Sequence, residues 1–325
     1  MYGIDDLKSK IEITESSVEC PHKSCSNRLM RQRGNFKRNH DFLCQTHGIY
    51  VSPSTFEYLR AEDNLLDASS PETGLLARIM GSKRESRMAR DRSEDALTWN
   101  VFRYMDGKEI LKAYFGEVFK DDSDIIEQVY WSYAIKAGIA WPELIRAREE
   151  FGESTALGSE PDLIIETVNA IYFIEAKYTS SNKTSGSRDD LAKRIANPKS
   201  YVNGGNGHFS KVFKSSYTKI VEDQKYELMR FWLLGSWIAQ QKKKRFMLIN
   251  IVRENTEVDI EHSFGIHINA SELRNIRRIT WESIGKYAVN ENHHAPCELS
   301  DYLESRSIGY DGNGVLGKAF TERMW

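Results

Sequence analysis

The sequence has no run approaching the roughly 18 consecutive apolar residues of a membrane-spanning helix. Its first residues, Met1 to Asp6, lack the charged and apolar pattern of a secretory signal. Cysteine is scarce: there are four in 325 residues, unevenly spaced and too few for a disulfide framework. These absences exclude an integral membrane protein and a disulfide-stapled secreted domain. They predict an intracellular, cytoplasmic protein with no membrane partner.

The sequence also has no large excess of positive or negative charge, because 45 basic and 47 acidic side chains leave a net charge of −2. Net charge alone therefore does not predict a nucleic-acid partner. The phosphate-binding motif G-x-x-x-x-G-K-[ST] is absent too, so any nucleotide-driven step would need another protein. With 40% hydrophobic residues, the chain can bury a core in one large domain or two smaller ones.

Cysteine and histidine gather in residues 1–60, which we predict to be a compact, zinc-ribbon-like unit. Two ligand pairs, spaced C-x4-C and C-x2-H, are Cys20 with Cys25 and Cys44 with His47. Three thiolates and one imidazole suit a tetrahedral zinc site, and a unit this small would need the metal to fold. His22 is the rival fourth ligand, and His40 is a weaker candidate.

Basic residues are clustered although the total charge is balanced. They recur between the cysteine pairs, in a connector over 61–92 and in a later turn, the candidates being Arg31, Arg33, Lys37, Arg38, Arg84, Arg87, Lys243 and Lys244. A charged run is usually just a solvated face. Its recurrence in several places predicts a surface that contacts nucleic-acid phosphates.

The remaining pattern alternates helices and strands. We expect a helix after the N-cap Ser93, a strand at 129–134, a helix at 142–150, and a polar loop over 179–215. Further helices are expected at 109–119 and 217–241, a buried strand at 246–252, and helical structure with an irregular tail from 269. The order predicts an α/β fold with a central sheet flanked by helices.

Two apolar strands in the middle of the chain carry the charged residues of most interest. Residues 162–166 and 170–177 predict a hairpin joined by Thr167, Val168 and Asn169, with Asn169 as the left-handed residue. Such a hairpin would place Asp162 near Glu175, with Lys177 on the same strand face two residues further on.

Two carboxylates and an ammonium held close together have an unfavourable electrostatic free energy unless a divalent cation lies between the acids. Mg²⁺ prefers oxygen ligands, lowers the pKa of bound water and polarises phosphoryl oxygens. The bland interpretation is a surface hairpin with a solvated Glu–Lys pair, because the pattern fixes few positions. The adjoining apolar strands favour a functional role, since stray charges are rare there.

The motif Pro161-Asp162 followed by Glu175-Ala176-Lys177 resembles that of the PD-(D/E)xK superfamily, which has the restriction-endonuclease-like fold. The resemblance spans roughly residues 93–255 and implies a mixed central sheet flanked by helices. It implies that Asp162 and Glu175 bind Mg²⁺ or Mn²⁺, with the Ala176 carbonyl as third ligand. Lys177 would then orient or deprotonate the attacking water.

The same resemblance implies an acidic ligand from the first core helix, for which Glu94 is the best match and Asp95 the reserve. Glu166, four positions after Asp162, is a lesser candidate for a direct role. Gln224 and Tyr226 on the later helix could reach the site, although packing or surface roles suit both better.

These features predict three segments: the zinc-ribbon-like unit at 1–60, the basic connector at 61–92, and a nuclease domain at 93–325 with a helical extension from about 269. The function they imply is a metal-dependent endonuclease acting on double-stranded DNA, in bacterial or phage genome defence, mobile-element activity or DNA processing. A homodimer would serve to cut both strands, and a multi-gene system would add partner proteins. The alternatives are a non-catalytic or partner-activated DNA-binding protein, and a nuclease acting on RNA or on branched or single-stranded DNA.

Overall fold

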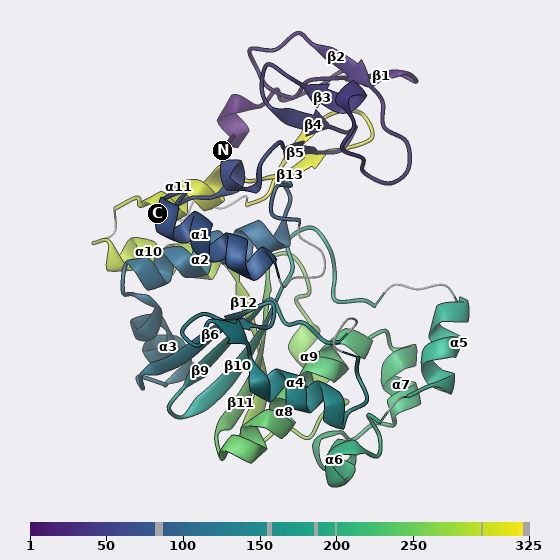
Figure 1. The fold of residues 1–325 in the computed structure, drawn as a ribbon, viewed down its shortest axis with the longest axis vertical. Helices are drawn as coiled ribbons and strands as arrows, with labels where there is room; N and C mark the ends of the chain where they lie inside the picture. Colours follow the sequence, from purple (N-terminus) through teal and green to yellow (C-terminus); the bar gives the residue numbers. More distant parts are fainter. Residues whose placement is uncertain (82–86, 155–157, 185–187, 199, 294, 321–325) are drawn as a thin grey trace. The chain divides into compact units, whose positions relative to one another are not determined.

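The computed structural model describes residues 1–81, 87–154, 158–184, 188–198, 200–293 and 295–320 (Figure 1). The chain forms two compact units. The first comprises Met1–Ala77, Glu85–Ile110 and Trp281–Trp325, and the second comprises Arg78–Arg84 and Leu111–Thr280. The two ends of the chain thus belong to one unit, which differs from the linear division expected at residues 60 and 92.

A seven-stranded sheet forms the centre of the second unit. Its order is β12-β11-β10-β9-β6-β7-β8. The strands are β6 (Ile125–Tyr130), β7 (Tyr133–Ala134), β8 (Ile139–Ala140), β9 (Leu163–Thr167), β10 (Ala170–Ala176), β11 (Arg245–Val252) and β12 (Arg274–Thr280). Strands β10, β11 and β12 are parallel, and the other neighbours are antiparallel. The expected α/β fold with a mixed central sheet is confirmed.

Helices cover both faces of this sheet (Figure 1). The helices of this unit, some of which pack on other helices instead of the sheet, are α3 (Leu111–Phe119), α4 (Pro142–Glu150), α5 (Arg188–Ala196), α6 (Gly204–Val212), α7 (Tyr217–Glu222), α8 (Tyr226–Lys242) and α9 (Ile260–Gly265). Tyr172 of β10 packs on Phe115 of α3, with ring centroids 4.7 Å apart. The next residue, Phe173, contacts Phe246, which packs on Trp232 of α8. Consecutive strand residues point to opposite faces, so α3 and α8 cover different sides.

The predicted hairpin is confirmed, with Ile174 paired to Leu163 and Ile171 to Glu166. Its turn differs from the prediction, because Asn169 does not have a positive φ. The Thr167 hydroxyl instead accepts a hydrogen bond from the Ala170 amide at 2.9 Å. This side-chain bond closes the turn without a left-handed residue.

Four other expectations need correction. The strand predicted at 129–134 breaks at Trp131 and Ser132, whose φ values are 45° and 81°. The helix predicted at 217–241 breaks at Gln224, with φ 59°, into α7 and α8. The polar stretch 179–215 contains α5 and α6. Residues after 269 also include the strand β12. Its arginines at 274, 277 and 278 follow no strict alternation with apolar residues, because β12 is the last strand of the sheet and all of its side chains except Ile276 stay partly or fully exposed.

The first unit combines short strands with helices from both ends of the chain. Its strands are β1 (Ser17–Glu19), β2 (Arg28–Met30), β3 (Leu43–Cys44), β4 (Ile49–Val51), β5 (Phe56–Tyr58), β13 (Ser307–Tyr310) and β14 (Leu316–Lys318). Its helices include α2 (Glu94–Gly107), α10 (Trp281–Glu291) and α11 (Glu298–Glu304), while α1 spans Ser70–Met80. The Ser93 side chain accepts a hydrogen bond from the Ala96 amide at 3.0 Å, as expected of an N-cap.

Buried hydrogen bonds explain why the C-terminal segment belongs with the N-terminal one. Asn100 donates to the Tyr302 hydroxyl at 2.9 Å, and Arg306 donates to the Tyr2 carbonyl at 2.9 Å. Leaving such groups unpaired in the interior would be costly. Within the described residues, no helix is both long and apolar enough to cross a membrane.

The buried His208 of α6 makes the stability of the second unit sensitive to acid. Its Nε2 lies 2.9 Å from the Ser236 hydroxyl. Burial, then the nearby Arg274 and Lys211, lower the pKa of His208 from 6.5 to about 4. The unfolded chain therefore binds a proton that the folded chain excludes, and stability is lost as the pH falls from 6.5 towards 4.

We predict that His208→Gln flattens this pH dependence, because glutamine can keep the bond to Ser236 but does not titrate. Urea unfolding at pH 7 and pH 4.5 should show the native protein losing roughly 1–3 kcal/mol more than the variant. The exposed His262 offers the matched control His262→Gln. Equal losses in the native protein and His208→Gln would contradict the prediction.

Candidate functional site

The predicted motif converges at one end of the central sheet. Asp162 immediately precedes β9, Glu175 and Ala176 end β10, and Lys177 follows. The Asp162 carboxylate accepts a hydrogen bond from the Ala176 amide at 2.8 Å. The hairpin thus brings residues 162 and 175–177 together, as the spacing predicts.

The side chains of Glu175 and Lys177 are buried and form an ion pair. The Lys177 ammonium also lies 3.4 Å from a carboxylate oxygen of Glu227, in the first turn of α8. Glu227 was missed in the sequence. The break at Gln224 starts a new helix, and Glu227 in its first turn lies near the end of β10. The expected continuous helix instead made Gln224 and Tyr226 the candidates.

Tyr226 itself has a packing role, as expected. Its hydroxyl lies 3.4 Å from that of Tyr201, and Arg194 and Arg230 lie over its ring. Gln224 occupies the turn, where its carbonyl accepts a hydrogen bond from the Thr184 amide.

Burial raises the pKa of Glu175 well above its usual value. Lys177 opposes this rise, and the negative charges of Asp162 and Glu227 add to it. The desolvated Glu175 carboxylate therefore lies near two further carboxylates and one ammonium. A cation with oxygen ligands would relieve this excess of negative charge, so the donor set is compatible with a divalent metal.

The backbone adds an oxygen donor on the Asp162 side. The Lys177 amide donates to the Ile251 carbonyl at 2.7 Å, towards β11, while the Ala176 amide points to Asp162. Because the amide and carbonyl of one strand residue point to the same side, the Ala176 carbonyl also faces the Asp162 side. This is the side that its expected role as a ligand requires.

The carboxylates do not yet form a compact metal-sized group. Among the described residues, the one group of three or more His, Cys, Asp or Glu ligand atoms within 4.8 Å of one another is Cys20, Cys25, Cys44 and His47. At the sheet end, the Lys177 ammonium lies between the Glu175 and Glu227 carboxylates instead. A metal ion there requires the acids to move closer together.

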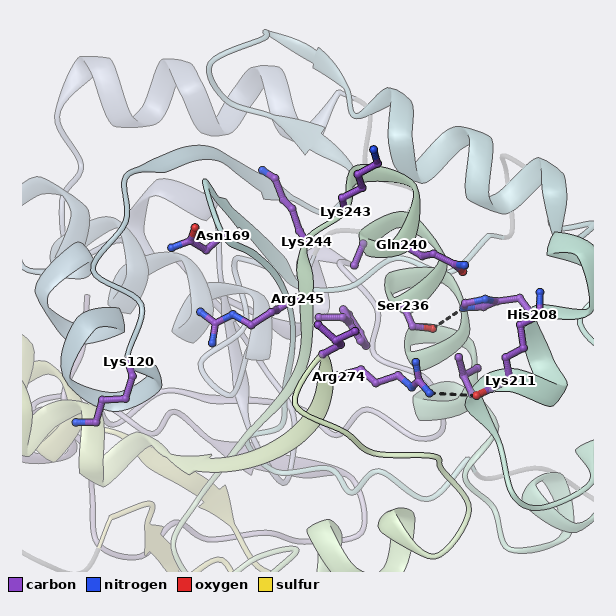
Figure 2. A pocket seen from close by; sticks show the side chains of 14 residues that line it. Lys120, Asn169, His208, Lys211, Ser236, Gln240, Lys243, Lys244, Arg245 and Arg274 are labelled. Carbon is purple, nitrogen blue, oxygen red and sulfur yellow. Dashed lines mark hydrogen bonds between the residues drawn. The ribbon is translucent and has the colours of Figure 1, made fainter.

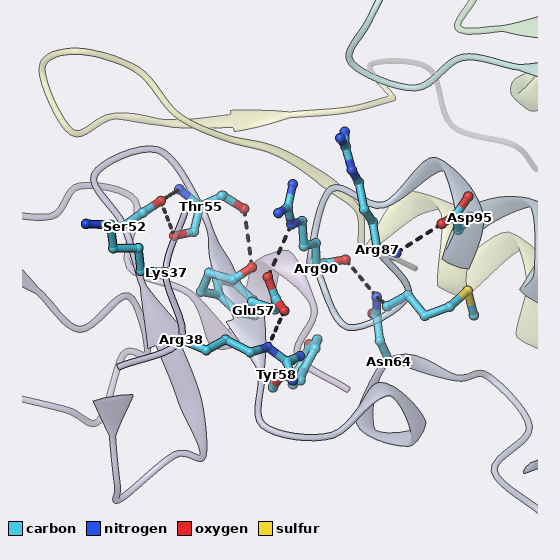
Figure 3. A network of polar contacts seen from close by, with 12 residues as sticks. Lys37, Arg38, Ser52, Thr55, Glu57, Tyr58, Asn64, Arg87, Arg90 and Asp95 are labelled. Atoms are coloured by element: carbon cyan, nitrogen blue, oxygen red, sulfur yellow. Dashed lines mark hydrogen bonds and ion pairs between the residues drawn. The ribbon is translucent and has the colours of Figure 1, made fainter. Parts of the chain in front are cut away.

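Glu94 opens α2 in the first unit, whereas Asp162, Glu175 and Lys177 lie in the second. Its role as a further ligand stays a prediction. The reserve candidate Asp95 accepts a hydrogen bond from the Arg87 amide at 3.1 Å, as Figure 3 shows. Glu166 is held by Lys242 and Lys244 at 2.7 and 2.6 Å.

Asn250 supports the strand end from β11 and was also missed. It is fully buried opposite Glu175 and donates to the Glu175 carbonyl at 3.2 Å. Its side chain also exchanges hydrogen bonds with the Asn182 side chain at 2.8 and 3.1 Å. This pair fastens the segment after Lys177 to the sheet.

The four predicted metal ligands of the first unit come together. The Cys25 and Cys44 sulfurs lie 3.7 Å apart, and His47 Nδ1 lies 3.5 Å from the Cys44 sulfur. Their ligand atoms, with that of Cys20, can hold one metal ion. Gly48 follows with φ 62°, a conformation that favours glycine in the tight turn after the last ligand.

His22, the rival ligand, stacks on the His47 ring with centroids 4.0 Å apart. Its Nδ1 lies 2.9 Å from the Ser24 hydroxyl, so the geometry favours His47 as the fourth ligand. Burial lowers the pKa of His47, as do His22 and Lys8, and keeps it in the neutral form that binds metals. Burial, together with the nearby Cys44, raises the pKa of the Cys20 thiol; a metal ion would stabilise the thiolate instead.

The basic residues of the first unit differ in their partners, which are a carboxylate for some and backbone carbonyls for others. Arg38 and Arg90 both pair with the buried Glu57, at 2.6 and 3.2 Å (Figure 3). Arg31 and Arg33 donate to the backbone carbonyls of Thr14 and Glu15, and neither forms an ion pair with a carboxylate among the described residues. With Lys37, they line a surface hollow of about 480 Å³.

Among the other basic candidates, Lys244 is bound to Glu166, and Lys243 ends α8 in a left-handed conformation with φ 56°. Arg87 is exposed. Arg84 lies outside the described residues.

Comparison of the chain with protein-family models, curated proteins and solved structures found no match.

The cysteine–histidine cluster predicts one bound divalent metal ion per chain. Cys44→Ser and His47→Ala should each lower the metal content of the purified protein and destabilise the first unit, because a ligand is removed. Elemental analysis and thermal unfolding measure both effects. His22→Ala is the matched control and should keep the metal; loss of metal from His22→Ala with retention in His47→Ala would reverse the ligand assignment.

Proposed function

We propose that this protein is a metal-dependent phosphodiesterase of the PD-(D/E)xK type that cuts double-stranded DNA, with the central sheet as a restriction-endonuclease-like core. The observation that carries the proposal is the meeting of Asp162, Glu175 and Lys177 at one sheet end, with Glu175 buried among an excess of carboxylates.

Each residue has a defined task in this proposal. Asp162, Glu175 and the Ala176 carbonyl would hold Mg²⁺ or Mn²⁺, which would supply an activated water and polarise a phosphoryl oxygen. If Glu175 held the metal, its ion pair with Lys177 would loosen. The Lys177 ammonium is then available to the scissile phosphate or attacking water, while Glu227 limits its movement.

The first unit would bind the substrate. We assign Zn²⁺ to Cys20, Cys25, Cys44 and His47, because this donor set suits tetrahedral zinc. The hollow beside it, with Arg31, Arg33 and Lys37, offers positive charge for backbone phosphates. Cutting both strands would call for a homodimer or a partner protein, and a setting in genome defence or DNA processing rests on the resemblance alone.

A second candidate is a DNA-binding protein that cuts only with a partner, or not at all. It is favoured by the Lys177 ammonium lying between Glu175 and Glu227 rather than beside a compact group of acids. The choice of DNA over RNA, or of duplex over branched or single-stranded DNA, is part of the proposal and is tested with it.

Cleavage is the decisive measurement. In Mg²⁺ or Mn²⁺, we expect the native protein to cut duplex DNA, and expect Asp162→Asn and Lys177→Ala each to slow cleavage by at least about 100-fold. Glu166→Gln is the matched control, because Glu166 is another buried, lysine-paired carboxylate of the same sheet. It should keep its activity.

Matched duplex, branched, single-stranded and RNA substrates separate the candidate activities. Undiminished cleavage by both Asp162→Asn and Lys177→Ala would refute the assigned site. DNA binding by the native protein without cleavage of any substrate would favour the second candidate.

Metal binding at the sheet end can be measured separately from cleavage. We expect Mn²⁺ to stabilise the native protein by about 2–3 kcal/mol at a hundredfold excess over its dissociation constant. Asp162→Asn and Glu175→Gln should lose this gain in thermal unfolding, and Glu166→Gln should retain it. An equal Mn²⁺ effect in all four proteins would place the metal elsewhere.

A further inference from the structure

A basic hollow lies at the opposite end of the central sheet from Asp162 and Glu175. It has a volume of about 830 Å³ and is bordered by α6, by the turn from α8 to β11, and by the start of β12 (Figure 2). Arg245 pairs with Ala170, the first residue of β10, whereas Glu175 is near its end. Since strand residues rise about 3.3 Å each, the two sites are separated by roughly 15–20 Å.

Positive charge dominates the lining. Six cationic side chains and no acidic residue line the hollow: Lys120, Lys211, Lys243, Lys244, Arg245 and Arg274. Glu166 holds Lys244 at 2.6 Å, and Asp121 lies 3.8 Å from Arg245. The other four make no ion pair with a carboxylate in the part of the chain that the structure describes. On a protein with a net charge of −2, such a concentration indicates an anionic ligand.

Buried polar groups distinguish this hollow from a solvated basic face. His208 and Ser236 line it although only 3% and 5% of their surfaces are exposed. The Ser236 hydroxyl donates to the Leu233 carbonyl, so His208 Nε2 is the donor in their mutual bond (Figure 2). His208 Nδ1 is then an acceptor; it is buried with no described donor within ordinary hydrogen-bond distance, and the Gln240 side chain, which also lines the hollow, interacts with the same ring.

The lining also has an apolar part, formed by Val212, Ala239, Phe246 and Leu273. A ligand that matches all of these features carries phosphate groups for the cations, an apolar part, and an N–H group for His208 Nδ1. The volume lies within the range of small-molecule sites, about 300–1,000 Å³.

We propose that this hollow binds a nucleotide, with its phosphates on Lys211, Lys243 and Arg274 and its base beside Phe246 and His208. The site is separate from the proposed phosphodiesterase centre. Its existence does not depend on cleavage.

The test is a fluorescence titration of the full chain with ATP carrying a methylanthraniloyl label. No divalent metal is added, so that the carboxylate site does not recruit the nucleotide. We expect saturable binding that unlabelled ATP displaces at lower concentrations than either tripolyphosphate or adenosine does. The double variant Lys211→Ala/Lys243→Ala should bind at least about tenfold more weakly, since two charge-assisted contacts are removed.

Lys214→Ala is the matched control, because Lys214 is an exposed neighbour of Lys211 and does not line the hollow. It should bind as the native protein does. No saturable binding, or equal binding by the double variant, would overturn the proposal. Displacement by tripolyphosphate as effective as by ATP, or displacement only by a single-stranded oligonucleotide, would also overturn it, in favour of a general anion site or a nucleic-acid contact.

Discussion

The register of β10 between β9 and β11 decides which side chains meet at the end of the sheet. Ile174 faces Leu163 across the antiparallel pair, and Glu175 faces Asn250 across the parallel pair. A slip of one residue would move Glu175 and Lys177 to the other face of the sheet. It would also break the bond from the Ala176 amide to Asp162. The geometry of the candidate site therefore depends on this register, which the buried apolar residues on both faces of β10 maintain.

The burial of Glu175 and Lys177 makes their charges important for the chemistry of the site. A Glu–Lys pair on a solvated hairpin would contribute little to stability, but Glu175 and Lys177 are both buried. Two further acids, Asp162 and Glu227, oppose the ionisation of Glu175. Such an arrangement is costly for the protein alone and would become favourable with a cation; perturbed carboxylates of this kind are typical of sites built for function rather than stability. Glu166 provides the contrast, because two lysines balance its charge within the fold.

Prediction succeeded where the determining interactions are local in sequence. The hairpin, the Ser93 cap and the cysteine–histidine spacing each depend on a few neighbouring residues, and the structure has all three. It failed where distant segments decide. Strand β12 was missed because this edge strand has three arginines and no regular alternation of polar and apolar residues. Glu227 was missed because a single left-handed residue at Gln224 divides the helix. Asn250 gave no signal, since an asparagine within an apolar strand acquires its role only from its partner Asn182.

The sequence by itself determined the α/β class, the cysteine–histidine cluster of the first unit, and the meeting of Asp162, Glu175 and Lys177 at one end of the sheet. Periodicity and spacing encode such features directly. Only the tertiary structure decided that the last 45 residues join the N-terminal unit, that Glu227 approaches Lys177, and that six cations surround one hollow at the far end of the sheet. These arrangements arise because packing brings together residues far apart in the chain, and nothing local in the sequence records which of them will meet.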